Sequence, residues 1–230
     1  NCTTPKKKSN GKVIITREQN QESIFSKTLQ QRGFQVHGIP FIQTQAISFS
    51  SVPDSDWIFF SSKRAIHYFF SQVERIPAKA KMAALSEGTA FELRKHVDKI
   101  DFIGSQVKTS EIALEFAEHC ENQSVLFPMA IDSLQSIQKS LSFSTKVINL
   151  YVYKTVELKV QAVPTAEVVV FTSPSNVRGF LESSSWNTPK QMAVSIGDST
   201  AYELKNHGIN STTAFGYSEL SLADTVLNLF

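Results

Sequence analysis

One motif occurs twice in this chain, as FSSKRAIHYF at residues 60–69 and as FTSPSNVRGF at residues 171–180. A second motif repeats at the same spacing of 111 residues, as TAFELRKH at 89–96 and as TAYELKNH at 200–207. The segment Val36–Thr44 also lies over Val147–Thr155 at this spacing. Separate matches at one offset indicate two copies of one unit, with a period far longer than that of a solenoid. We therefore predict an internal repeat of about 111 residues.

Each copy alternates short apolar runs with segments that carry apolar residues at helical spacing. The expected strands are Lys12–Thr16, Trp57–Phe60, Lys81–Leu85, Glu167–Phe171 and Gln191–Ile196. The expected helices are Glu22–Arg32, Ser62–Val73, Thr89–His96, Ser110–His119, Ser175–Glu182, Thr200–Asn206 and Glu219–Leu229. Regular alternation of this kind is typical of an α/β fold, in which helices flank both faces of parallel sheets.

The repeat also predicts how the chain is divided into domains. The segments Val36–Thr44 and Val147–Thr155 are rich in β-formers and stand between strand–helix blocks. If they pair, they form a two-stranded antiparallel linker between two lobes, a pairing that the sequence permits but does not require. We expect a flexible basic leader at 1–11, a first α/β lobe at 12–37 plus 160–230, the linker at 38–44 plus 149–159, and a second α/β lobe at 45–148.

The composition argues against several kinds of partner. A total of 23 Lys and Arg against 21 Asp and Glu gives a net charge of +2, whereas nucleic-acid-binding proteins usually carry a dense basic face. Cys2 and Cys120 are the only cysteines, which fits a reducing compartment rather than a disulfide framework. No apolar run approaches the roughly 20 residues that span a bilayer, and Lys6–Lys8 lead into Ser9 rather than into the apolar core of a signal peptide. We expect a cytoplasmic, monomeric protein that binds neither nucleic acid nor membrane.

Hydroxyl side chains follow the apolar strands at the points where helices begin. Thr16 and Arg17 end the first strand, and the other residues at such points are Ser61, Ser62, Ser86, Thr89, Thr172, Ser173, Ser175, Gly197, Ser199 and Thr200. Open α/β sheets bind ligands at the carboxyl ends of their strands, and helix N-termini favour anions. Ordinary N-capping explains any one of these hydroxyls. Five such strand ends together favour a ligand that carries several carboxylates or phosphates.

Motifs for other chemistries are missing from the sequence. It contains no Gly-x-Gly-x-x-Gly fingerprint, no Walker loop and no Gly-x-Ser-x-Gly elbow. The five histidines are scattered without an H-x-x-x-H pair, and His119 next to Cys120 is better explained as a helix end than as a metal site. We therefore predict no metal site and no nucleophile triad.

Several motifs occur in the order and spacing of a known family. They are Ile15–Arg17, Trp57–Ser62, Tyr153–Thr155, Val170–Val177 and Ser195–Ala201. With this ordered set the chain resembles the uroporphyrinogen-III synthase family, from about Lys12 to its end. One position departs from the family pattern, because Ser86 stands where the turn of that lobe usually has a glycine.

The resemblance implies two α/β lobes joined by a two-stranded ladder, with the ligand between them. It also implies a linear substrate, hydroxymethylbilane, which carries eight carboxylates, and a cyclisation that uses no cofactor. The first ring of the bilane loses its hydroxyl as water. The last ring then attacks through its substituted carbon to form a spiro intermediate, and it re-closes in inverted orientation to give uroporphyrinogen III.

The resemblance further implies roles for individual residues. Tyr153, on the second linker strand, is the candidate proton donor to the departing hydroxyl, because a phenol keeps its proton at neutral pH. The strand-end residues named above are expected to bind the substrate, together with Lys63 and Asn176. Arg64 and Arg178 are further candidates for steering the carboxylates.

Two other interpretations are open. A non-catalytic two-lobed protein that closes on a polyanion or a tetrapyrrole would have the same helix-terminus sites. A two-lobed sugar-nucleotide transferase would need a clear diphosphate loop with an acid or base beside it. Product selectivity distinguishes the synthase from the binding protein, and hydrolysis of a sugar-nucleotide donor would indicate the transferase.

Overall fold

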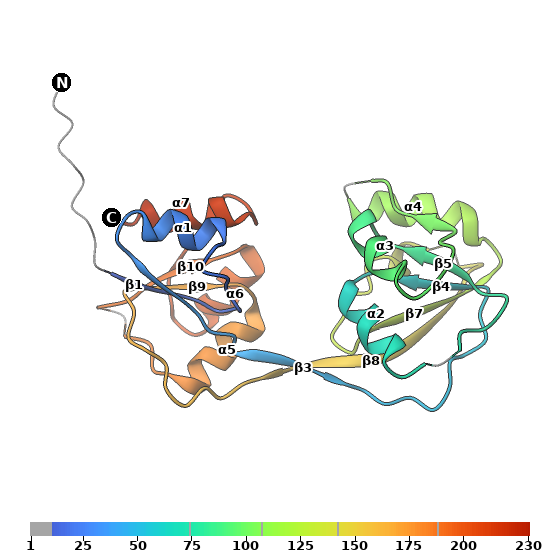
Figure 1. The fold of residues 1–230 in the computed structure, drawn as a ribbon, viewed down its shortest axis with the longest axis horizontal. Coiled ribbons are helices and arrows are strands. Elements are labelled where there is room, and N and C mark those ends of the chain that lie inside the picture. The colour runs from blue at the N-terminus through green and yellow to red at the C-terminus, as the bar shows by residue number, and fades with distance from the viewer. Residues whose placement is uncertain (1–10, 74, 107, 142, 188) are drawn as a thin grey trace, which may run out of the picture. The chain divides into compact units, whose positions relative to one another are not determined.

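The computed structural model describes residues 11–230 except 74, 107, 142 and 188, so most of the expected leader at 1–11 lies outside the described residues. The chain divides into two compact units (Figure 1). Unit 1 comprises Asn1–Gln43 and Val156–Phe230, and unit 2 comprises Thr44–Thr155. The N-terminal segment and the C-terminal part of the chain thus belong to the same unit.

Unit 1 is built on a five-stranded sheet with the strand order β11-β10-β9-β1-β2, in which all neighbours are parallel. Its strands are β1 (Lys12–Ile15), β2 (Gln35–Gly38), β9 (Val168–Phe171), β10 (Met192–Ser195) and β11 (Ser211–Thr213). Its helices are α1 (Ile24–Gln30), α5 (Pro174–Ser183), α6 (Asp198–Asn206) and α7 (Glu219–Leu227).

Unit 2 contains most of a six-stranded sheet with the order β3-β8-β7-β4-β5-β6, parallel from β8 to β6. The strands are β3 (Ile42–Ala46), β4 (Trp57–Phe60), β5 (Lys81–Ala84), β6 (Phe102–Ile103), β7 (Ser124–Ala130) and β8 (Lys146–Glu157). The helices are α2 (Lys63–Phe70), α3 (Glu87–Leu93), α4 (Thr109–Cys120) and the 3₁₀ turn η1 (Gln138–Ser140).

Apolar side chains on alternate strand residues fill a core on each face of each sheet. In unit 1, Val13 and Val168 pack in one cluster with residues of α1 and α7, whereas Ile14 and Val169 pack in another with residues of α5 and α6. In unit 2, one cluster includes residues of α4 and the other includes residues of α2 and α3. Burial on both faces explains why the central strands β4 and β9 are apolar throughout. The prediction of parallel sheets flanked by helices is confirmed.

The two sheets have corresponding strand orders. The order β2-β1-β9-β10-β11 in unit 1 matches β8-β7-β4-β5-β6 in unit 2. The registers correspond as well, because Val168 pairs with Met192 in unit 1 and Trp57 pairs with Lys81 in unit 2. Both residues of the first pair lie 111 positions after those of the second. Residues that repeat in the sequence therefore occupy equivalent places in the two sheets.

The segment Val36–Thr44 contains parts of two strands, β2 and β3. Val36 lies in β2 and pairs with Val13, whereas Thr44 lies in β3, the neighbour of β8. Pro40 stands between the two strands and cannot donate a backbone hydrogen bond to a ladder, so it interrupts the strand. Pro40 is therefore the local signal in the sequence that marks the break between the two strands.

Strands β3 and β8 run in opposite directions. The N–H of Ile47 donates to the carbonyl of Val152 at 2.9 Å, and the N–H of Leu158 donates to the carbonyl of Phe41 at 2.8 Å. The residue numbers of the partners increase on one strand while they decrease on the other, which defines an antiparallel pair. Each of the two strands has residues in both units.

Candidate active site

The candidate residues of unit 1 lie at one edge of its sheet. Ile15 pairs with Val170, and Phe171 pairs with Ser195. The residues that follow these strands therefore leave the sheet together at its carboxyl edge, where α/β proteins bind ligands. This edge brings the predicted strand ends of unit 1 together: Thr16, Arg17, Thr172, Ser173 and Gly197.

Thr16 and Thr172 fasten two of these strand ends to each other. The N–H of Thr172 donates to the Thr16 hydroxyl at 3.0 Å, and the Thr172 hydroxyl donates to the Thr16 carbonyl at 3.0 Å. The Thr16 side chain is completely buried. Its hydroxyl provides the acceptor for the Thr172 N–H, and it fixes the turn in which Thr172 remains partly exposed.

Ser173 and Asn176 organise the N-terminus of α5. The Ser173 hydroxyl caps the helix by accepting from the Asn176 N–H at 3.2 Å, as a serine N-cap does. The Asn176 side chain is 3% exposed; its amide nitrogen donates to Ser173, and its oxygen accepts from the N–H of Phe41 at 3.0 Å. Asn176 therefore ties α5 to the chain that leads into β3. Ser175 is partly exposed on the first turn.

Helix α6 begins without a side-chain cap. Its N-cap is Gly197, followed by the exposed residues Asp198 and Ser199 and by Thr200, which is almost completely buried. The first turn of a helix leaves N–H groups without intrahelical partners, and these groups suit an anion. At this position the accessible groups are the backbone, the Asp198 carboxylate and the Ser199 hydroxyl, while Thr200 packs inward.

Arg17 is held by Glu219, the first residue of α7. Their side chains form an ion pair at 3.1 Å, and Glu219 also accepts from Gln19 at 3.2 Å and from the N–H of Phe25 at 3.2 Å. Burial alone would raise the pKa of Glu219, but these hydrogen bonds and the charge of Arg17 outweigh it, so the pKa is lowered. Part of the charge of Arg17 is thus compensated within unit 1.

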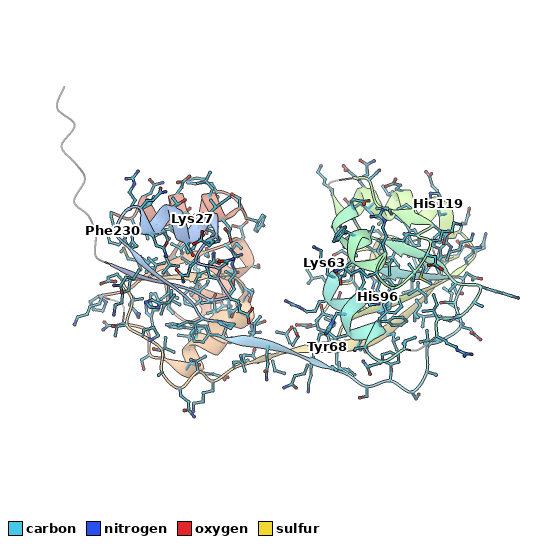
Figure 2. All side chains as sticks on the ribbon, in the orientation of Figure 1. Lys27, Lys63, Tyr68, His96, His119 and Phe230 are labelled. Carbon is cyan, nitrogen blue, oxygen red and sulfur yellow. The ribbon has the colours of Figure 1, made fainter. Side chains whose placement is uncertain are left out.

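Unit 2 presents a similar carboxyl edge. Phe60 pairs with Ala84, so α2 and α3 begin beside each other. The Ser62 hydroxyl caps α2 by accepting from Ala65 at 3.1 Å, between the exposed residues Ser61 and Lys63. Figure 2 labels Lys63 on α2.

Helix α3 starts two residues earlier than predicted because Ser86 is its N-cap. The Ser86 hydroxyl accepts from the N–H of Thr89 at 3.4 Å. Ser86 and Gly197 are equivalent in the repeat, and both have extended backbones, with φ of −154° and −175°. The difference lies in their surroundings, since a Cβ at Gly197 would lie 3.1 Å from the ring of Tyr217. Serine at position 86 is therefore compatible with the turn. Thr89, on the first turn of α3, is 5% exposed.

Tyr153 lies on β8, paired with Ala130 just after a β-bulge. Its side chain is 9% exposed and stacks on Tyr68 of α2, with ring centroids 5.2 Å apart and planes at 19°. The Tyr68 hydroxyl is 2.8 Å from the Thr44 hydroxyl and donates to the Thr44 carbonyl at 2.9 Å. Tyr68, labelled in Figure 2, thus supports the candidate acid from within unit 2. Sequence reasoning missed it, because nothing in the helical pattern marks its contact with β8.

Arg178 differs from the expectation of a free steering cation. Its guanidinium pairs with Glu157 at 3.1 Å and with Glu203 at 3.3 Å, and it also donates to Ser175 at 3.3 Å. Arg64 is exposed on α2.

Within the described part of the chain, no group of three His, Cys, Asp or Glu side chains could hold a metal ion. No helix among the described residues is long and apolar enough to cross a membrane.

Comparisons with known proteins identify the family. The family model of uroporphyrinogen-III synthase HemD matches residues 23–223. The structure of uroporphyrinogen-III synthetase from Helicobacter pylori 26695 matches with a TM-score of 0.72 and 21% identity, over 96% of this chain and 100% of that one. A mutant uroporphyrinogen III synthase from the extremely thermophilic bacterium Thermus thermophilus matches with a TM-score of 0.50 and 13% identity, over 95% of this chain and 97% of that one. These structures share the fold, and the family match spans most of the sequence. The chain therefore belongs to the uroporphyrinogen-III synthase family, whose members are enzymes of porphyrin biosynthesis.

Proposed function

We propose that this protein cyclises hydroxymethylbilane to uroporphyrinogen III, as a carbon–oxygen lyase that releases water and inverts the last pyrrole ring. Membership of the family supports the reaction. The observation that carries the assignment in the structure is the carboxyl edge of each sheet, at which helix N-termini and hydroxyl groups gather in each unit. Such edges can hold many carboxylates by directed hydrogen bonds without a large basic patch.

We assign two kinds of role to the predicted binding residues. The exposed or partly exposed groups contact substrate carboxylates directly: Arg17, Ser61, Ser62, Lys63, Ser86, Thr172, Ser173, Ser175, Gly197 and Ser199. The buried residues Thr16, Thr89, Asn176 and Thr200 hold the turns in place. This division follows from accessibility, because a side chain with almost no exposed surface has little area left for a ligand.

The chemical step needs a leaving group and a constraint on geometry. Electron density from the pyrrole nitrogen expels the hydroxyl of the first ring, and a proton delivered to that oxygen lets it depart as water. Tyr153 is the proposed donor, and stacking on Tyr68 would fix the direction of its phenol. The free bilane closes directly to the type I isomer, so the larger task of the protein is to hold the last ring for attack through its substituted carbon.

The architecture suggests how the substrate is enclosed. We propose that the two units are copies of one ancestral repeat and act as two lobes, with the antiparallel pair β3 and β8 as their linker. Closure of both carboxyl edges on the bilane would exclude water and restrict its rings. We further propose that the enzyme works as a cytoplasmic monomer and uses no cofactor, since its substrate already contains the reacting groups.

The test is the identity of the product. The purified protein is mixed with freshly generated hydroxymethylbilane, the products are oxidised, and the type I and type III isomers are separated. We expect type III to dominate through many turnovers. Type I alone, formed at the spontaneous rate by a folded protein that still binds tetrapyrroles, would contradict the proposal and favour a binding protein.

A further inference from the structure

Two large aromatic side chains lie in solvent beside the candidate site of unit 1. They belong to the loop that joins β11 to α7, in which Phe215 is 95% exposed and Tyr217 is 78% exposed. Thr213 pairs with Ser195, and the N–H of Ala214 donates to the carbonyl of Ser195 at 2.9 Å. The loop therefore leaves the sheet at its carboxyl edge, next to the strand end that leads into α6.

The ring of Tyr217 lies against the start of α6. A Cβ added to Gly197 would be 3.1 Å from ring atom Cε1 of Tyr217 and 3.3 Å from its hydroxyl oxygen. These distances are tighter than ordinary van der Waals contacts, so the missing side chain at position 197 makes room for the ring. At the other end of the loop, Ser218 caps α7 by accepting from the N–H of Ser221 at 3.1 Å. The backbone of the loop is fixed at both ends while its aromatic rings stay accessible.

We propose that Phe215 and Tyr217 position the substrate by packing against pyrrole rings of the bilane. The inference rests on the proposed function and adds apolar contacts to a site so far described by its polar groups. A bilane combines flat, electron-rich rings with carboxylate arms. The arms suit the N-terminus of α6 and Ser199, and the ring faces suit aromatic side chains a short distance away. Exposed aromatic residues that adjoin a polar site are typical of binding surfaces.

This role predicts a specific kinetic effect. A contact between two aromatic rings contributes enough binding free energy that removal of one ring should raise the Michaelis constant about two- to tenfold. The turnover number should change less, because neither side chain is assigned a proton transfer. The Tyr217→Phe variant should keep the wild-type Michaelis constant, since the ring rather than the hydroxyl makes the contact.

The experiment compares Phe215→Ala, Tyr217→Ala and Tyr217→Phe in the full chain, with hydroxymethylbilane as substrate. The matched control is Phe143→Ala, which removes an exposed aromatic ring near the amino end of β8 in unit 2, away from the carboxyl edge. Because Phe215 and Tyr217 are so exposed, thermal unfolding should occur at the wild-type temperature in all four variants. Phe215→Ala provides an independent test if the Tyr217→Ala variant is destabilised by the loss of its contact with Gly197.

The outcomes separate this inference from the proposed function. Higher Michaelis constants for the two alanine variants, with Phe143→Ala and Tyr217→Phe unchanged, support it. If the alanine variants are stable and their Michaelis constants are unchanged, this inference is overturned. Formation of the type III isomer by the wild-type protein would still support the proposed synthase function. A dimer that the alanine substitutions dissociate, without an effect on the Michaelis constant, would overturn it by assigning the rings to an interface between copies. Wild-type protein without type III activity would overturn the proposed function and this inference with it.

Discussion

Asn176 illustrates how a predicted binding residue can act through the backbone. Its side chain is buried, and both of its polar ends are engaged, one with Phe41 and the other with the start of α5. The sequence motif correctly placed this residue at a helix N-terminus, but the motif could not indicate the partner 135 positions away. The burial of Thr16, Thr89 and Thr200 was unpredictable for the same reason, since burial depends on which elements pack over each turn.

Replacement of Asn176 by alanine should destabilise unit 1. The substitution leaves the buried N–H of Phe41 without its acceptor, and an unpaired buried donor costs about 1–3 kcal/mol. Urea denaturation measures the loss. The control is Ser199→Ala, an exposed hydroxyl on the first turn of α6, which should change the free energy of unfolding by less than about 0.5 kcal/mol. Equal stability of the two variants would argue against the Asn176–Phe41 contact.

Tyr153 should assist the chemical step without being indispensable. If the main contribution of the protein is geometric, Tyr153→Phe should lower the turnover number by no more than about a hundredfold, the lower end of typical general-acid effects. The Michaelis constant should stay nearly constant, because the ring and its stacking on Tyr68 are retained. Tyr151→Phe, on the same strand, is the control. Complete loss of turnover in a folded Tyr153→Phe variant would mean that proton donation dominates.

At the scale of elements, helices α5 and α2 each hold a part of the chain in or next to β3. In unit 1, Gly179 of α5 lets the backbone of Phe41 approach so closely that a Cβ would lie 2.2 Å from the Phe41 carbonyl oxygen. At the equivalent position in unit 2, Tyr68 of α2 binds Thr44 through its hydroxyl. The two units thus differ in how each contacts the chain in or next to β3. Strand and helix order follow from the apolar pattern, but these contacts depend on tertiary packing.

Substitution of Gly179 by alanine should therefore be costly. The new methyl group would collide with backbone, which cannot rotate away as a side chain can, and overpacking of this kind costs about 1–3 kcal/mol. The matched control is Gly88→Ala in α3, where the nearest atom to the new Cβ is 3.9 Å away. That change should be neutral or stabilising by up to about 1 kcal/mol, because alanine favours helices. Similar unfolding free energies for both variants would contradict the close approach.

The contact between α7 and α1 should depend on pH through Glu219. The folded protein lowers the pKa of the Glu219 carboxyl group below 4.5. The folded state therefore favours the ionised carboxylate more than the unfolded chain does. Glu219 therefore stabilises the fold at neutral pH, and that contribution disappears as the pH falls through the folded pKa. The difference in unfolding free energy between wild type and Glu219→Gln should be largest near pH 7 and should narrow on acidification. A difference that widens toward low pH would contradict this sign.

At the scale of the whole molecule, the two units have corresponding strand orders, as the predicted internal repeat would produce. Each unit provides a parallel sheet whose carboxyl edge carries helix N-termini, and the chain enters unit 1 twice because unit 2 lies between its two segments. The α/β class and the placement of hydroxyl residues at strand ends were accessible to sequence reasoning because they are local patterns. The role of Tyr68 and the exposed loop at Phe215 were not, because each depends on contacts between distant segments.

The central claim is that this protein directs hydroxymethylbilane to the type III isomer. The most direct measurement is the initial rate of formation of each isomer as the protein concentration is raised at a fixed concentration of bilane. The account predicts that the type III rate rises in proportion to the protein concentration while the yield of type I falls correspondingly. A yield of type I that does not depend on the concentration of folded protein, with no type III formed, would contradict the account.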